Sequence, residues 1–422
     1  MESVTSTAPP PTRSAPGTST ALLVLAIVVV ALNLRGPIVN ISPVLDAIRA
    51  DLGIGAGTAG LLTSLPVLCF ALATPLASLL LARAGLERGV LIALGALLAG
   101  TLLRSAGGSG PGGLWAVVAG TLVIGVAITV GNVAVPVVVG RDVPARRAGI
   151  VLGGYTAALN VGSMIMLSFT VPLAAGLGWR PALAAWGVVA VLAAVIWWLG
   201  TRGNARRAAE AAAADEGDAG GPVWWRRPIV WTLAIAFGGQ AFSYYGVTAW
   251  LPLLLHDELG MDPAAAGVSA SVFQIAAVAG AFGVPVLLRR GAGPLPALLA
   301  VCAAWAALPL GLLLAPHLWL VWCALGGAAQ GGGFTVIFSI VVRAARGPAE
   351  SRKMSALVQG GGYLVAATGP AVVGAVHEAT GTWAVPLLIV LGAIAVLTAA
   401  GTASARASVH QRELEGVVLR RV

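Results

Sequence analysis

The chain has 422 residues, of which 58% are hydrophobic and 10% are charged, and its mean hydropathy is +0.92. A soluble globular domain has about 25% charged residues, so this composition excludes a soluble protein and indicates one that is embedded in lipid. The net charge of +9 does not indicate nucleic-acid binding, because the basic residues stand in short breaks between apolar segments and not in one stripe with interleaved aromatic residues.

The N-terminal segment, residues 1–20, is rich in Pro, Ser and Thr. It lacks the basic region and the cleavage site of a signal peptide, so we predict a disordered cytoplasmic tail. Twelve apolar segments follow, and each comes close to the roughly 20 residues that a transmembrane helix needs. In chain order, we predict helices at 21–47, 57–82, 89–106, 114–139, 149–175, 181–200, 228–255, 264–288, 294–315, 317–342, 354–376 and 383–401.

Basic residues are distributed unevenly over the breaks between these segments. If the N-terminus is inside, the outside breaks hold only Arg49, Arg104 and Arg180, whereas Arg35 lies within the first helix and all other basic residues lie inside. Because positive residues are retained in the cytoplasm, this bias predicts a multi-pass protein of the cytoplasmic (inner) membrane with both termini in the cytoplasm. It also supports the helix count, because one missed helix would invert every later break.

The two halves of the chain resemble each other. Asp-Leu-Gly at 51–53 follows the first helix and Glu-Leu-Gly at 258–260 follows the seventh. A six-helix unit repeated in parallel is a transporter plan in which the binding site lies between the halves, near the middle of the membrane. We therefore predict an all-α membrane protein with twelve transmembrane helices in two six-helix bundles. The bundles occupy 21–200 and 228–401, with a cytoplasmic linker at 201–227 and a cytoplasmic tail at 402–422.

Arg35 is the strongest sign of a binding site. It lies near mid-membrane in the first predicted helix, where an arginine costs at least about 2.5–3.5 kcal/mol and cannot lose its proton. None of the sixteen acidic residues lies at mid-membrane depth in a predicted helix, so we expect no carboxylate beside Arg35. Since the forked guanidinium suits carboxylates and similar groups, we predict that it binds an anionic or polar small molecule. Structural pairing with carbonyls or polar side chains is the alternative.

Polar and aromatic residues near the middle of other helices are further candidates for substrate contact. Gln240 and Tyr244 are four residues apart and share a helix face, and Gln359 and Tyr363 repeat that spacing. The candidates in the fourth, fifth and tenth helices are Asn132, Asn160, Gln330 and Phe334. Interhelical hydrogen bonds use the same polar residue types, so packing is the alternative for each. We assign Asn33 to packing or to the cavity edge, because it lies far around the helix from Arg35.

Several motifs resemble one transporter family. Asn-Leu-Arg-Gly-Pro at 33–37, Ser-Pro-Val-Leu at 42–45 and Thr-Gly-Thr-Trp at 380–383 are similar to the cyanate and 2-nitroimidazole transporter family of the major facilitator superfamily, and the resemblance runs along nearly the whole chain. It implies a secondary transporter that works by alternating access and carries a small anionic or polar organic solute, such as a cyanate-like or nitroimidazole-like compound.

Four residues are predicted to serve gating. Gly36 and Pro37 directly follow Arg35, where proline removes a backbone hydrogen bond and weakens the helix. By resemblance to the superfamily, Arg83 belongs to the latch loop between the second and third helices, although Ala82 replaces the usual Asp of that loop. Asp142 belongs to the similar Arg-Asp break after the fourth helix.

Other classes of protein fit less well. A multidrug or metabolite efflux pump of the same superfamily is the main alternative, but it would favour an acidic residue in the cavity. The three cysteines lie in apolar segments without CxxC spacing, and we find no catalytic cluster or nucleotide-binding motif. We therefore predict no enzyme activity, no metal, no cofactor and no nucleic-acid partner. The expected partners are the lipid bilayer and a small-molecule substrate, with a monomer as the working unit.

Overall fold

The structure is a computed structural model, and it describes residues 20–143, 145–202, 224–346 and 348–419. Residues 1–19 of the predicted tail and residues 203–223 of the predicted linker lie outside the described residues. The described part is helical, without a strand. The first half contains α1 (Thr20–Leu32), α2 (Gly36–Val39), η1 (Ser42–Val44), α3 (Leu45–Leu52), α4 (Ala56–Leu72), α5 (Thr74–Ala84), α6 (Leu86–Ala106), α7 (Gly110–Asp142), α8 (Ala145–Leu177), α9 (Trp179–Ala185) and α10 (Gly187–Thr201).

The second half begins at η2 (Trp224–Arg226) and ends in a long final helix. Its elements are α12 (Pro228–Leu259), α13 (Pro263–Arg289), α14 (Pro294–Leu314), η3 (Pro316–Leu318), α15 (Trp319–Ala344), α16 (Pro348–Ala366), α17 (Gly369–Thr380) and α18 (Ala384–Leu419). α18 therefore continues beyond the predicted end of the last span at 401, into the segment predicted as a tail.

The number of membrane spans agrees with the predicted architecture. Ten helical stretches of the described chain are long and apolar enough to cross a membrane, and the pair α4 and α5, bent by 59°, makes an eleventh. α12 is long enough but less apolar, because Gln240, Ser243, Tyr244 and Tyr245 interrupt its middle. With α12, these stretches account for the twelve predicted helices. Most residues of α12 are buried within the protein, whereas Trp231 and Ile235 near its start are 49% and 51% exposed.

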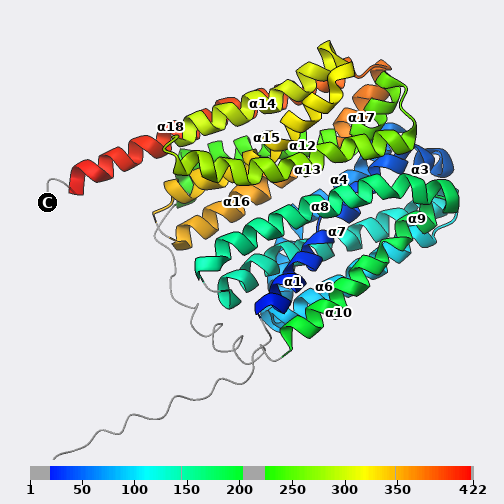
Figure 1. Cartoon of the computed structure of the whole chain (residues 1–422), viewed down its shortest axis with the longest axis horizontal. Coiled ribbons are helices and arrows are strands. Elements are labelled where there is room, and N and C mark those ends of the chain that lie inside the picture. The colour runs from blue at the N-terminus through cyan, green and yellow to red at the C-terminus, as the bar shows by residue number, and fades with distance from the viewer. Residues whose placement is uncertain (1–19, 144, 203–223, 347, 420–422) are drawn as a thin grey trace, which may run out of the picture.

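The two halves pack side by side (Figure 1). In the first half, α1 packs against α8 and α10, and α6 packs against α7; in the second half, α12 packs against α16 and α18, and α13 packs against α15. The interface between the halves is formed by α8 against α13 and by α4 against α16 and α17, with η1 against α12. Residues of α1–α2, α4, α8, α12 and α16 therefore meet in the middle of the molecule.

The first span differs from the continuous helix predicted at 21–47. α1 ends at Leu32, residues 33–35 form a turn, and the single turn of α2 ends at Val39. Pro37 and Pro43 cause these breaks because neither residue can donate a backbone hydrogen bond. Arg35 consequently lies at the break itself, with φ −136° and ψ −37°, and not on the face of a regular helix.

Candidate functional site

Arg35 lies at the boundary between the two halves. Its Nη1 donates a hydrogen bond to Oδ1 of Asn160 in α8, over 3.0 Å. Its Cζ lies 5.1 Å from the centre of the Tyr244 ring, which belongs to α12 in the other half, so the contact is a cation–π interaction. The structure thus brings together three residues that the sequence singles out from three different helices.

No carboxylate pairs with Arg35 among the described residues. The ion pairs that the structure contains there join Asp46 to Arg49, Asp51 to Arg180, Arg141 to both Glu87 and Asp142, Arg227 to Glu350, and Asp257 to His377. All of these pairs lie near the ends of helices. In this part of the chain, Arg35 therefore has no carboxylate partner, as the sequence predicts.

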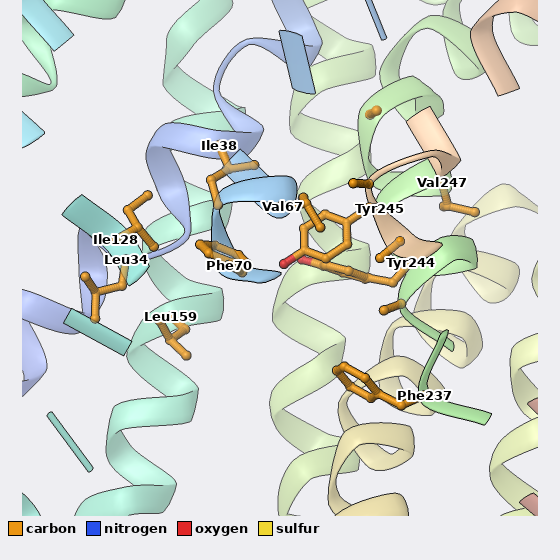
Figure 2. Packing of buried hydrophobic residues seen from close by; sticks show 14 of the residues in the cluster. Leu34, Ile38, Val67, Phe70, Ile128, Leu159, Phe237, Tyr244, Tyr245 and Val247 are labelled. Carbon is orange, nitrogen blue, oxygen red and sulfur yellow. The ribbon is translucent and has the colours of Figure 1, made fainter. Parts of the chain in front are cut away.

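Tyr244 contacts Arg35, and the other tyrosines lie within electrostatic range of its guanidinium. The chain contains four tyrosines, and the side chains of all four, Tyr155, Tyr244, Tyr245 and Tyr363, interact electrostatically with its guanidinium. Figure 2 shows the rings of Tyr244 and Tyr245 extending from α12 toward Phe70, with their phenol oxygens at the tips. Sequence reasoning did not place Tyr155 or Tyr245 in the site, although the scarcity of tyrosine in so long a chain is a usable signal.

Two of these phenols are oriented by amide side chains. The hydroxyl of Tyr155 donates to Oδ1 of Asn132 over 2.9 Å, within the first half. The hydroxyl of Tyr244 donates to Oε1 of Gln274 over 3.3 Å, within the second half. Asn132 therefore bonds to a tyrosine that lies within electrostatic range of Arg35. Gln274 is a buried residue of α13 that the sequence analysis did not single out.

Aromatic rings form a continuous group beside Arg35. Tyr363 makes edge contacts with Phe70 at 5.3 Å and with Phe237 at 5.2 Å between ring centres. Phe237 in turn contacts Phe334 and Phe338. Phe334 is 40% exposed. The two predicted candidates Phe334 and Tyr363 are thus joined through Phe237, and that either ring contacts substrate stays a prediction.

The glutamines that the sequence predicts in the site make no hydrogen bond to Arg35 within the described chain. Gln240 is buried, and its Nε2 donates to the backbone carbonyl of Gln330 over 3.3 Å, which joins α12 to α15 inside the second half. Gln330 is also buried. Gln359 is half-buried and makes no hydrogen bond to another described residue. No hydrogen bond among the described residues joins Gln240 or Gln330 to Arg35. The amide of Gln240 joins two helices, whereas Nε2 of Gln330 is buried without a hydrogen-bond partner among the described residues.

Asn33 packs between helices. Its Nδ2 donates to the carbonyls of Val29 and Val189 over 3.0 and 3.3 Å, and the side chain is 1% exposed. Among the predicted gating residues, Gly36 packs so closely on α8 that a Cβ would lie 2.4 Å from Sδ of Met166. Pro37 accepts a hydrogen bond on its carbonyl from Arg104.

The other two predicted gating residues lie at the far end of the first half. Arg83 is exposed in the last turn of α5. Asp142 accepts from Arg141 over 2.7 and 2.8 Å, and Arg141 also pairs with Glu87. This cluster joins α6 to α7 within one half.

Arg104 requires a correction. We expected it among the outside breaks, but the structure places it inside α6 with 1% of its surface exposed. The distribution of charges along the sequence cannot distinguish a buried arginine in the last turn of a helix from an arginine in the following loop. Arg104 was expected in an outside break for this reason.

The halves are hydrogen-bonded to each other at one end, the α3 end, where α3, α9 and α17 lie (Figure 1). Oγ of Ser42 donates to the carbonyls of Thr248 and Ala249 over 3.0 and 2.5 Å. The amide of Gly57 donates to the carboxylate of Glu378 over 3.4 Å. Every hydrogen bond between the halves that the described chain contains belongs to this group, so the α3 end is closed.

A repeat of membrane helices in two halves that meet near the middle of the membrane is the architecture of many secondary transporters. The family model described as Major Facilitator Superfamily matches residues 23–346, and the chain belongs to this superfamily. The predicted fold class is confirmed, and the protein is a membrane transporter rather than an enzyme.

Relatives and solved structures agree with this assignment. The chain is 32% identical to the "Uncharacterized transporter YycB" of Bacillus subtilis, covering 91% of this chain and 93% of the relative. It is 31% identical to the "2-nitroimidazole transporter" of Escherichia coli, covering 88% of this chain and 92% of the relative. It is 26% identical to the "Cyanate transport protein CynX" of Escherichia coli, covering 88% of this chain and 94% of the relative. These matches confirm the family resemblance. The D-xylose-proton symporter, at 13% identity and a TM-score of 0.70, covers 92% of this chain and 97% of its own, and shares the fold.

Proposed function

We propose that this protein is a secondary active transporter that moves a small anionic or polar organic solute across the cytoplasmic membrane by alternating access. The observation that supports the proposal is Arg35, which meets Asn160 and Tyr244 between the halves and contacts no carboxylate among the described residues. A cation that is partly removed from water needs a counter-charge. A bound anion or a strongly polarised solute supplies it, and the guanidinium offers two parallel donors to such a group.

The neighbours of Arg35 also favour a small and flat solute. The tyrosine hydroxyls and the amide of Asn160 are neutral, so they orient a polar group without cancelling the charge of Arg35. The rings of Phe70, Phe237 and Tyr363 meet edge to face, and such rings suit contact with a planar molecule. The names of two relatives, for 2-nitroimidazole and cyanate, describe solutes of this kind.

Alternating access requires that the closed end opens. The distribution of basic residues puts the α3 end outside and the termini in the cytoplasm, so the described state is closed to the outside. Opening would break the contacts of Ser42 with Thr248 and Ala249 and the contact of Gly57 with Glu378. The helices beside the site bend at two points. One is the break directly before Gly36 and Pro37, and the other is the break between α4 and α5.

The proposal is tested by ligand-dependent thermal stabilisation of the purified protein, followed by uptake into proteoliposomes. The panel contains cyanate, nitrate, azide and formate as anions, and 2-nitroimidazole and imidazole as heterocycles. We expect at least one anion or polarised heterocycle to stabilise the protein and to be transported, and Arg35→Gln to remove both responses. Arg49→Gln is the matched control, because Arg49 pairs with Asp46 at the surface. Equal responses of Arg35→Gln and the unaltered protein would show that Arg35 is structural.

A further inference from the structure

A second arginine of the first half is more deeply buried than Arg35. Arg104 in α6 is 1% exposed, and no described acidic residue pairs with it. Its Nη1 donates to the carbonyl of Pro37 over 3.0 Å, and its Nη2 donates to Oδ1 of Asn40 over 3.3 Å. Both acceptors belong to the broken segment that contains Arg35.

The cluster of Arg104, Pro37 and Asn40 leaves two buried hydrogen-bond donors unpaired within the described chain. Nε of Arg104 and Nδ2 of Asn40 are buried without a hydrogen-bond partner among the described residues. A buried cation that lacks a carboxylate is costly, and well-packed apolar residues usually give a more stable protein. A contribution to stability therefore does not explain an arginine at position 104. The hydrogen bonds of Arg104 to Pro37 and Asn40 offer a different explanation.

Arg104 replaces a hydrogen bond that the helix break removes. In an unbroken helix the carbonyl of Pro37 would accept from the amide of Ile41, but α2 ends at Val39 and the described backbone bonds do not include that pair. Carbonyls at the end of a helix carry partial negative charge and favour a cation. Nη1 of Arg104 occupies this position, so it fixes the end of α2 relative to α6.

The support behind Arg104 is rigid. α6 and α7 approach so closely that a Cβ on Gly120 would lie 2.5 Å from the backbone nitrogen of Arg104. Arg35 is only two residues before Pro37, and its own carbonyl accepts from the amide of Ile38 in α2. A displacement of α2 would therefore move Arg35 with it.

The geometry points to Arg104 as a positioning residue, which holds α2 through Pro37 and Asn40 and thereby sets where the Arg35 guanidinium meets the substrate. This inference rests on the proposed function. It assigns to Arg104 a role in ligand affinity although the side chain does not reach the space between the halves.

A double-mutant cycle in ligand affinity tests this role. The full-length protein is purified as the unaltered chain, Arg104→Lys, Arg35→Lys and the double variant. The dissociation constant is measured for the compound of the panel that stabilises the unaltered chain most. We expect Arg104→Lys alone to weaken binding at least about fivefold. Independent sites multiply their effects within about twofold, so we expect the double variant to bind at least about threefold better than the product of the two single losses predicts.

Controls separate the possible failures. Arg49→Lys should leave affinity within about twofold. If Arg104→Lys does not fold, Asn40→Ala takes its place in the cycle, because it removes one acceptor of Arg104 and leaves Pro37 in place. If the losses of affinity in the two single variants multiply in the double variant, or if Arg104→Lys loses no affinity, the inference is overturned. The proposed function would still be supported by a loss of affinity in Arg35→Lys. If no compound of the panel binds, or if Arg35→Lys and Arg35→Gln both bind normally, the proposed function fails and the inference fails with it.

Discussion

The two halves contribute unlike chemistry to one site. Leu-Gly at 52–53 and at 259–260 ends the corresponding segments, and both glycines adopt the left-handed conformation, with φ of 66° and 62°. Counted back from these glycines, Arg35 corresponds to Phe242 and Pro37 corresponds to Tyr244. The first half has a broken helix with a cation at the break, whereas the second half has the continuous 32-residue helix α12 with phenols on it. At these corresponding positions of a duplicated plan, the first half has the cation and the second half has a phenol ring that contacts it.

The largest effect is expected when the charge is moved between the halves. The double variant Arg35→Tyr with Tyr244→Arg keeps both residue types, but places the arginine at a position that is 3% exposed and packed against Tyr245 and Phe273. Burying a cation there costs at least about 2.5–3.5 kcal/mol, so we expect loss of measurable binding and a lower melting temperature. Binding at normal affinity would show that the halves are interchangeable.

A smaller effect is expected from Arg35→Lys. Lysine keeps the charge but loses the planar fork that serves Asn160 and a ligand together. One hydrogen bond to a charged group contributes about 1.5 kcal/mol or more, so titration should show affinity for the anion weakened about tenfold. An unchanged dissociation constant would mean that the charge alone matters.

Removal of the ring from the second half should have a lesser effect. Tyr244→Leu loses the cation–π contact with Arg35, which contributes about 1 kcal/mol, so we expect affinity to fall about fivefold in the same titration. Tyr244→Phe is the matched control and should stay within about twofold, because it keeps the ring and loses only the bond to Gln274. A large loss in Tyr244→Phe would assign the role to the hydroxyl.

The smallest effect on binding is expected from Gln240→Leu. Its amide bonds to the Gln330 carbonyl within the second half, so the variant should bind ligand within about twofold of normal while it loses about 1 kcal/mol of stability. A melting curve with and without ligand measures both quantities. A strong loss of affinity would return Gln240 to the binding site that the sequence predicts.

These comparisons show which features the sequence could predict. The helices follow from long apolar segments and from the sidedness of the basic residues, and Arg35 stands out because a charge at mid-membrane is costly. The directions of Gln240 and Gln330 depend on how each helix is rotated in its bundle, which spacing along one helix does not determine. Tyr155 and Tyr245 come within electrostatic range of Arg35 because segments that are distant in the sequence pack together. The binding of substrate by Arg35 and the other candidate residues remains a prediction.

The closed end has a consequence for comparing sequences. Ser42 donates to the main-chain carbonyls of Thr248 and Ala249, so this contact does not depend on which side chains those two positions carry. Substitutions at 248 and 249 can therefore accumulate without a compensating change at 42. A search for covarying pairs of positions would not detect this contact, although it joins the two halves directly.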